Sequence, residues 1–90
     1  MMIHSVSITV IGHVQGVGFR YHTLREAELL EIRGFVNNQP DGSVYIEAEG
    51  ESEKLEVFVQ WCRKGPPHAR VLLAEVKRIE VRNYEKFQIE

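Results

Sequence analysis

The spacing of the apolar residues changes period several times along this sequence, and that succession constrains the fold more than any other feature. Over residues 4–14 the apolar residues Val6, Ile8, Val10 and Val14 share one parity, which is the period of a half-buried strand. Over residues 20–32 they recur every three residues among strong helix formers, which predicts a helix. Residues 34–38 predict a short strand, residues 39–42 a turn, and residues 43–49 alternate again with Val44, Ile46 and Ala48 inward, so we expect a hairpin.

A second helix is predicted from Ser52 onwards. Serine is a residue type that caps helix N-termini, and apolar residues of the stretch 55–62 follow it at helical spacing. Cations, a glycine and two prolines at residues 63–67 predict the end of this helix.

The C-terminal part of the sequence completes the pattern. Residues 71–81 predict a further strand with Leu73 and Val76 as its inward anchors, and residues 87–89 a short edge strand. The order is then β-α-β-β-α-β, the split β-α-β arrangement of ferredoxin-like folds. We therefore expect an α+β fold in which two helices cover one face of an antiparallel sheet.

Length and charge limit what the chain can do. Its 90 residues with 43% hydrophobic content suffice for one core, so we expect residues 1–90 to form a single domain. The formal charge of −2 provides no positive field to attract nucleic acid or an anionic membrane. No apolar run approaches the roughly 18 residues of a membrane helix. A lone cysteine and a start without signal-peptide features indicate a cytoplasmic protein, which we expect to be a soluble monomer.

A loop with two glycines between the first predicted strand and helix is the strongest candidate for a binding site. Gly16 and Gly18 allow positive φ and close approach of a ligand, and the helix N-terminus that follows leaves N–H groups unpaired. Arg20 adds a charged guanidinium whose fork matches two phosphate oxygens. Residues 15–20 could therefore form an anion-binding nest, and the alternative is an ordinary turn with a solvated arginine.

Other kinds of site fit this sequence poorly. No Gly-Lys-Ser/Thr follows the loop as in a Walker motif, and Tyr21 stands where a dinucleotide fingerprint has glycine or alanine. The four histidines lack the i, i+4 spacing of a metal site, and Cys62 lies on the apolar stripe of the second helix as a core thiol would. We therefore expect no metal and no other cofactor.

Two longer motifs give the sequence a specific resemblance. Residues 10–20 (VIGHVQGVGFR) resemble the first sequence motif of the acylphosphatase family, and residues 34–44 (GFVNNQPDGSV) resemble the second. Residues 65–71 (GPPHARV) are similar to the family's loop after the second helix. The resemblance spans nearly the whole chain. It implies an enzyme that hydrolyses acyl phosphates to a carboxylate and inorganic phosphate.

The resemblance also implies roles for individual residues. Backbone amides of the loop would cradle the phosphoryl group, and the Arg20 side chain would clamp it. The loop residues are Gln15, Gly16, Val17, Gly18, Phe19 and Arg20. Asn38, by its match to the second motif, would orient the attacking water. Asn37 is the rival, since adjacent side chains of a strand point to opposite faces and only one asparagine can face the loop.

Some positions depart from the family pattern or carry their own expectation. Glu31 stands where the family usually has glycine at the end of the first helix, and a left-handed conformation there would strain the backbone. Asn37 stands where the family more often has a basic or small side chain. We expect Gly12 at a bulge or close contact, and the glutamate-rich stretch 47–56 as a solvated turn and helix start.

Two other functions stay open at this point. A non-catalytic phosphate or acyl-phosphate-binding module would keep the loop without turnover. An RNA-binding domain shares this element order but needs exposed aromatics on a basic sheet face, whereas the strand at 43–49 offers Tyr45 beside the acidic Glu47. The partner that we expect is a small-molecule acyl phosphate, not nucleic acid or a membrane. Nothing in the sequence identifies the acyl group.

Overall fold

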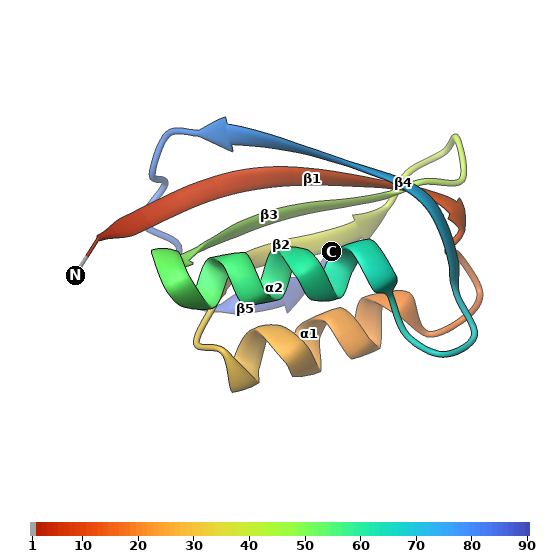
Figure 1. The fold of residues 1–90 in the computed structure, drawn as a ribbon, viewed down its shortest axis with the longest axis horizontal. Coiled ribbons are helices and arrows are strands. Elements are labelled where there is room, and N and C mark those ends of the chain that lie inside the picture. Colours follow the sequence, from red (N-terminus) through yellow and green to blue (C-terminus); the bar gives the residue numbers. More distant parts are fainter. Residues whose placement is uncertain (1) are drawn as a thin grey trace.

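A computed structural model describes residues 2–90 of the chain. The elements follow in the order β1 (Ile3–His13), α1 (Phe19–Leu29), β2 (Arg33–Asn38), β3 (Val44–Glu51), α2 (Ser52–Lys64), β4 (Arg70–Ile79) and β5 (Phe87–Ile89). Both helices lie against the same face of the sheet (Figure 1), as the order of elements predicts. Within residues 2–90, neither helix is both long enough and apolar enough to cross a bilayer.

The sheet has five strands in the spatial order β4-β1-β3-β2-β5. Neighbours among the first four strands are antiparallel, but β5 runs parallel to β2, with Gly34 opposite Phe87. The expected antiparallel sheet is therefore a mixed one. The reason is that the chain leaves β4 at one edge, crosses the sheet and reaches the other edge already running in the direction of β2.

The core lies between the sheet and the helices. Val44, Ile46 and Ala48 of β3 are fully buried, which confirms the predicted inward face. Ile46 stands opposite Ile8 of β1, and both pack with buried residues of the two helices. Cys62 of α2 belongs to this core, where burial raises the pKa of its thiol, so it is the core thiol that the apolar stripe predicts.

The first helix ends earlier than predicted, at Leu29 instead of Ile32. Glu31 has φ 57°, which is the left-handed conformation expected if it replaces the helix-end glycine. The N–H of Glu31 donates to the carbonyl of Glu28 (3.3 Å), and that of Ile32 donates to the carbonyl of Ala27 (2.8 Å). These two bonds form a Schellman motif with a non-glycine residue at its left-handed position.

Two predictions in the second half, one helix boundary and one inward-facing residue, are wrong. Ser52 is the first helical residue and Glu51 takes the N-cap position, because β3 runs directly into α2 and the Ser52 N–H donates to the carbonyl of Met2 (3.0 Å). Leu73 is 51% exposed, whereas its neighbour Ala74 is buried.

The exposure of Leu73 follows from a bulge in the pairing of β1 with β4. The register shifts between Ile11 and Gly12, so the alternation of β4 slips beside Leu72. A Cβ on Gly12 would lie 2.1 Å from the carbonyl oxygen of Arg70, which confirms the expected close backbone contact.

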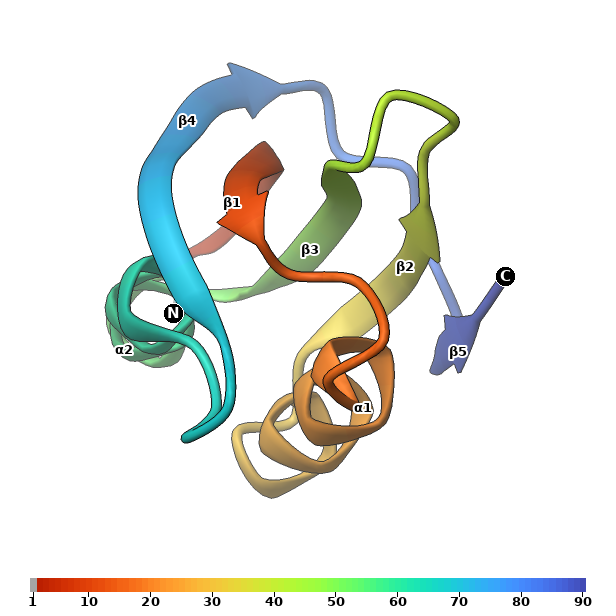
Figure 2. The ribbon, with the colours of Figure 1, turned by 90° about the vertical axis from the view of Figure 1, so that its right-hand side faces the viewer.

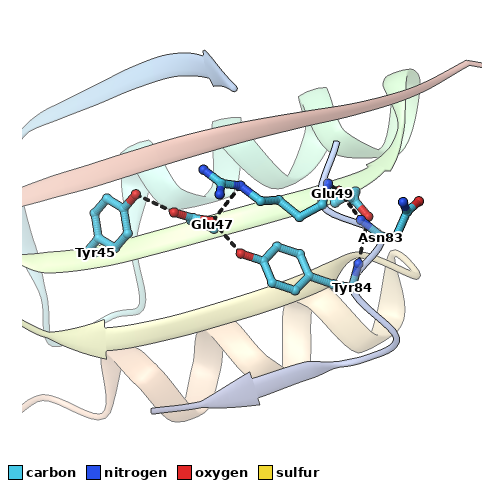
Figure 3. Close-up of polar contacts among 6 residues, drawn as sticks. Tyr45, Glu47, Glu49, Asn83 and Tyr84 are labelled. Carbon is cyan, nitrogen blue, oxygen red and sulfur yellow. Dashed lines mark hydrogen bonds and ion pairs between the residues drawn. The ribbon is translucent and has the colours of Figure 1, made fainter. Parts of the chain in front are cut away.

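The glutamate-rich stretch is not fully solvated, which corrects a further expectation. Glu49 is completely buried on the sheet face that points away from the helices (Figure 3). Its carboxylate accepts hydrogen bonds from the N–H groups of Arg82 (2.7 Å), Asn83 (3.3 Å) and Tyr84 (3.1 Å). Glu49 thus fastens the crossing segment between β4 and β5 to the middle of the sheet.

Glu47 supports the same segment. It accepts hydrogen bonds from the hydroxyl groups of Tyr45 (2.7 Å) and Tyr84, and its carboxylate lies 3.6 Å from Nε of Arg82 (Figure 3). Burial opposes the charge of this carboxylate, but the two tyrosines and Arg82 outweigh it and lower the pKa of Glu47. The crossing segment is therefore held by buried carboxylates, and β5 can reach β2.

Candidate active site

The β1–α1 loop, the β2–β3 turn and the α2–β4 connection lie at one end of the molecule, which Figure 2 views directly. Gly16 (φ 75°) and Gly18 (φ 77°) both adopt left-handed conformations in the β1–α1 loop, and Gly18 is the N-cap of α1. Left-handed residues alternating with ordinary ones turn successive N–H groups toward a common point. The loop therefore has the backbone conformation of an anion-binding nest.

The N–H groups of residues 15–20 donate to no acceptor within residues 2–90. The first turn of α1 contains no acidic side chain that could take their place. Unpaired N–H groups at a helix N-terminus carry partial positive charge and favour an anion. This row of donors is the central feature of the site.

Phe19 fixes the loop to the core. Its side chain is 2% exposed and packs at 5.8 Å between ring centroids on Trp61 of α2. Its carbonyl accepts a hydrogen bond from the buried hydroxyl of Thr23 (2.7 Å). The side chain of Phe19 thus anchors the loop to the core, while the N–H groups of the loop stay unpaired within the described residues.

Arg20 borders a depression of about 230 Å³ next to the loop. Its lining consists of Val14, Gly16, Gly18, Phe19, Arg20, Tyr21, Asn38 and Ile89. The exposed Arg20 side chain forms no hydrogen bond or ion pair with another side chain in the described part of the chain. Its positive charge is therefore available to a ligand in the depression.

Asn38, the last residue of β2, lies in the same lining, whereas Asn37 does not. The side-chain oxygen of Asn37 instead accepts a hydrogen bond from the side chain of Gln39. Strand alternation separates the two asparagines, and the structure places Asn38 on the side of the loop.

The predicted loop residues do not all face the depression. Gly16, Gly18, Phe19 and Arg20 do, but Val17 packs partly against the core, and the Gln15 side chain points to the β2–β3 turn. Ile89 lines the depression although sequence reasoning gave it no role. Only the crossing of the chain to β5 brings it there, so no local signal could have found it.

A larger depression of about 540 Å³ lies between α1 and the α2–β4 connection. It is lined by His22, Trp61, Lys64, Gly65, Pro66, Pro67 and Ala69. Its size exceeds that of the first, but it lacks the row of unpaired N–H groups, so the smaller depression is the better candidate for phosphate. Within residues 2–90, no three His, Cys, Asp or Glu side chains gather as they would around a metal ion.

Solved structures that resemble this chain differ in how much of the resemblance goes beyond the fold. The chain superposes on the Klebsiella pneumoniae protein BlrP1 with a TM-score of 0.68 at 16% identity, over 99% of this chain and 24% of that one, which shows a shared fold alone. The crystal structure of acylphosphatase from Bacillus subtilis matches far more closely, with a TM-score of 0.93 and 37% identity over 99% of both chains. The ferredoxin-like α+β fold is thereby confirmed.

The sequence comparison extends this result. Residues 6–89 match the family model described as Acylphosphatase. A protein named acylphosphatase from Archaeoglobus fulgidus is 51% identical over 85 residues, which cover 94% of this chain and 96% of the relative. The chain belongs to the acylphosphatase family.

Proposed function

We propose that this chain hydrolyses acyl phosphates to a carboxylate and inorganic phosphate at the β1–α1 loop. The N–H groups of residues 15–20 and the Arg20 guanidinium hold the phosphoryl group, and Asn38 orients the attacking water. The observation that carries the proposal is the row of unpaired N–H groups beside an unpaired arginine and an asparagine in one depression. Membership of the acylphosphatase family agrees with it.

The chemistry of the substrate explains why so few groups suffice. An acyl phosphate expels a carboxylate whose conjugate acid has a pKa of about 4, so its departure needs no general acid. What remains is to stabilise charge on the phosphoryl oxygens and to hold water in line with the leaving group. N–H groups and a guanidinium do the first, and a neutral amide that can both donate and accept does the second.

The proton of the attacking water needs an acceptor. No side chain in the lining of the depression is an apparent base. We therefore assign proton acceptance to an oxygen of the substrate's own phosphoryl group. Because all proposed contacts hold the phosphate end, we expect the enzyme to tolerate different acyl groups.

The sheet face that points away from the helices carries features that argue against RNA binding as the function. Phe35, Tyr45 and Tyr84 do cluster there, with ring centroids 5.9 and 6.1 Å from Phe35. However, the hydroxyl groups of both tyrosines donate to the Glu47 carboxylate. Negative charge among these aromatics repels a nucleic-acid backbone, so we expect no RNA binding.

Release of phosphate from benzoyl phosphate by the purified protein, with EDTA present, tests the proposal. We expect turnover that Arg20→Ala reduces by on the order of a hundredfold or more. Binding of inorganic phosphate without release from benzoyl phosphate would instead identify a non-catalytic phosphate-binding module. Binding of single-stranded RNA with no release would leave the RNA-binding alternative.

A further inference from the structure

The side chain of Gln15 joins two parts of the candidate site that are far apart in the sequence. Its Nε2 donates one hydrogen bond to the carbonyl of Gln39 (2.8 Å) and another to the carbonyl of Ser43 (2.9 Å). An amide nitrogen carries only two hydrogens, so both are spent on the β2–β3 turn. The Gln15 side chain is therefore unavailable as a donor to substrate, although its backbone N–H belongs to the loop.

These two bonds are not needed to form the turn itself. The Gln39 N–H already donates to the carbonyl of Ser43 (2.9 Å), and the Gly42 N–H donates to the carbonyl of Gln39 (3.1 Å). Each carbonyl therefore accepts one bond inside the turn and a second bond from Gln15. What Gln15 adds is a fixed connection between the turn and the phosphoryl loop.

Asn38 lies immediately before this turn and depends on its surroundings for its position. Its own side chain forms no hydrogen bond with another side chain within residues 2–90, whereas both sequence neighbours are tethered. Asn37 accepts a bond from the Gln39 side chain, and the carbonyl of Gln39 accepts the bond from Gln15. Pairing with Val44 of β3 holds the backbone of Asn38, and Gln15 ties the turn that follows it to the loop.

We propose that Gln15 is a positioning residue that clamps the turn carrying Asn38 to the phosphoryl loop. This inference rests on the proposed function. Water must be held in line with the leaving group, and a misplacement of about 1 Å can reduce a rate by on the order of a hundredfold. Phosphate binding needs only the loop and Arg20, so loss of the clamp affects turnover and spares phosphate affinity.

The variant Gln15→Met tests this role, because it removes both donors while keeping an unbranched side chain and the backbone N–H. We expect kcat to fall about tenfold or more with benzoyl phosphate, with KM and the inhibition constant of inorganic phosphate within about threefold of wild type. In an Asn38→Ala background the same change should alter kcat by less than about twofold, since the group being positioned is gone.

Arg63→Met provides the matched control. It removes a side-chain bond to the carbonyl of Ala74 (3.0 Å) that joins α2 to β4, outside the lining of the depression. We expect it to leave kcat unchanged. An unchanged kcat in Gln15→Met, an equal loss in both Asn38 backgrounds, or a raised KM with normal kcat would overturn the proposal.

A second measurement does not require turnover. In ¹⁵N–¹H spectra of Gln15→Met we expect the side-chain amide signal of Asn38 to shift or broaden, while phosphate still shifts the backbone signals of Gly16 and Gly18. An unchanged Asn38 signal would refute the clamp. If the wild type binds phosphate but releases none from benzoyl phosphate, the proposed function fails, and this measurement still decides whether Gln15 holds Asn38.

Discussion

The molecule contains two turns in which backbone N–H groups converge, and the two differ in what they bind. The segment between β4 and β5 directs the N–H groups of Arg82, Asn83 and Tyr84 at the Glu49 carboxylate (Figure 3). The β1–α1 loop directs the N–H groups of residues 15–20 at no acceptor within residues 2–90. Each turn uses left-handed residues, Asn83 (φ 61°) in the first and two glycines in the second.

The difference separates a structural use of this geometry from a functional one. Where the chain supplies its own carboxylate, charge-assisted hydrogen bonds hold a long crossing segment in place. Where it supplies none, the N–H groups stay unpaired, and we propose that they bind an anion from solution. The same local backbone geometry serves the fold at Glu49 and, in our proposal, a ligand at the loop.

The β1–α1 loop, whose N–H groups have no acceptor within residues 2–90, is called the open turn below. Removal of positive charge from the open turn should give the largest effect. Arg20→Ala deletes the only side-chain cation in the lining of the depression, so we expect kcat/KM to fall by on the order of a hundredfold to a thousandfold, with a raised KM and a lowered kcat. Phosphate release from benzoyl phosphate measures both. Arg78→Ala, on the exposed surface of β4, makes the same change in net charge and should keep wild-type kinetics. Equal losses in both variants would mean that only overall charge matters.

Asn38→Ala should affect turnover more than binding. The open turn still holds phosphate, but no amide orients water, so we expect kcat to fall about a hundredfold with KM nearly unchanged. Asn37→Ala is the control on the opposite side of the strand, and we expect it to lose less than about fivefold. A wild-type rate in Asn38→Ala would exclude the water-positioning role.

The segment between β4 and β5, whose N–H groups bind the Glu49 carboxylate, is the filled turn. A change there should lower stability and leave turnover intact. Glu49→Gln keeps the size of the side chain but replaces one acceptor oxygen by a donor that faces an N–H group. We expect the free energy of unfolding to fall by about 2 kcal/mol, measured by urea denaturation, with kcat of the folded protein within about twofold of wild type. The exposed Glu56→Gln should change neither quantity. A loss of turnover without a loss of stability would contradict the structural role of this turn.

The sequence predicts the open turn but not the filled one, for a physical reason. Apolar parity, two glycines and a following helix are local features, and they suffice to place the loop and Arg20. The partners of Glu49 lie 33 to 35 residues further along the chain, so no local pattern shows that its charge is satisfied. The parallel pairing of β5 and the place of Ile89 in the site depend on the same crossing segment.

Element boundaries depend on more than local chemistry. The left-handed helix end at Glu31 is expected only from the acylphosphatase resemblance, which places a glycine at that position, and the structure has this conformation. The predicted N-cap of α2 is wrong because the Ser52 N–H donates to the carbonyl of Met2, just before β1, and the predicted inward position of Leu73 is wrong because a bulge shifts the alternation of β4. Both errors come from tertiary pairing that competes with a local preference.

Acid should weaken the structural turn through Glu47. Its pKa is lowered from the ordinary 4.5, so its contribution to stability is complete above that value and is lost as the pH falls through the lower folded value. Tyr84 behaves in the opposite sense: burial and its bond to Glu47 raise its pKa to about 12, so its contribution is lost as the pH rises from 10 toward 12.

Urea denaturation at about pH 7 and about pH 3 checks the acid limb. We expect wild type to lose about 1 kcal/mol more than Glu47→Gln on acidification. Equal losses in both proteins would show that other carboxylates control the acid transition.

Glu31 provides the smallest and most local test, since it is a left-handed residue that belongs to neither turn. It has the conformation that Gly16 and Gly18 adopt freely and Asn83 adopts readily, but its longer side chain suits that conformation less well. Its ion pair with Lys54 is solvent-exposed, and such pairs stabilise proteins little. Glu31→Gly should therefore raise Tm by about 4 °C in a thermal unfolding scan.

Glu31→Ala separates the two contributions at this position. Alanine removes the ion pair but keeps a Cβ, so it should leave Tm unchanged or slightly lower, in contrast to glycine. If both variants lowered Tm, the ion pair with Lys54 would outweigh backbone strain. Left-handed residues would then be tolerated in this chain wherever a side chain finds a partner, and the glycines of the open turn would be needed for access of the ligand rather than for conformation.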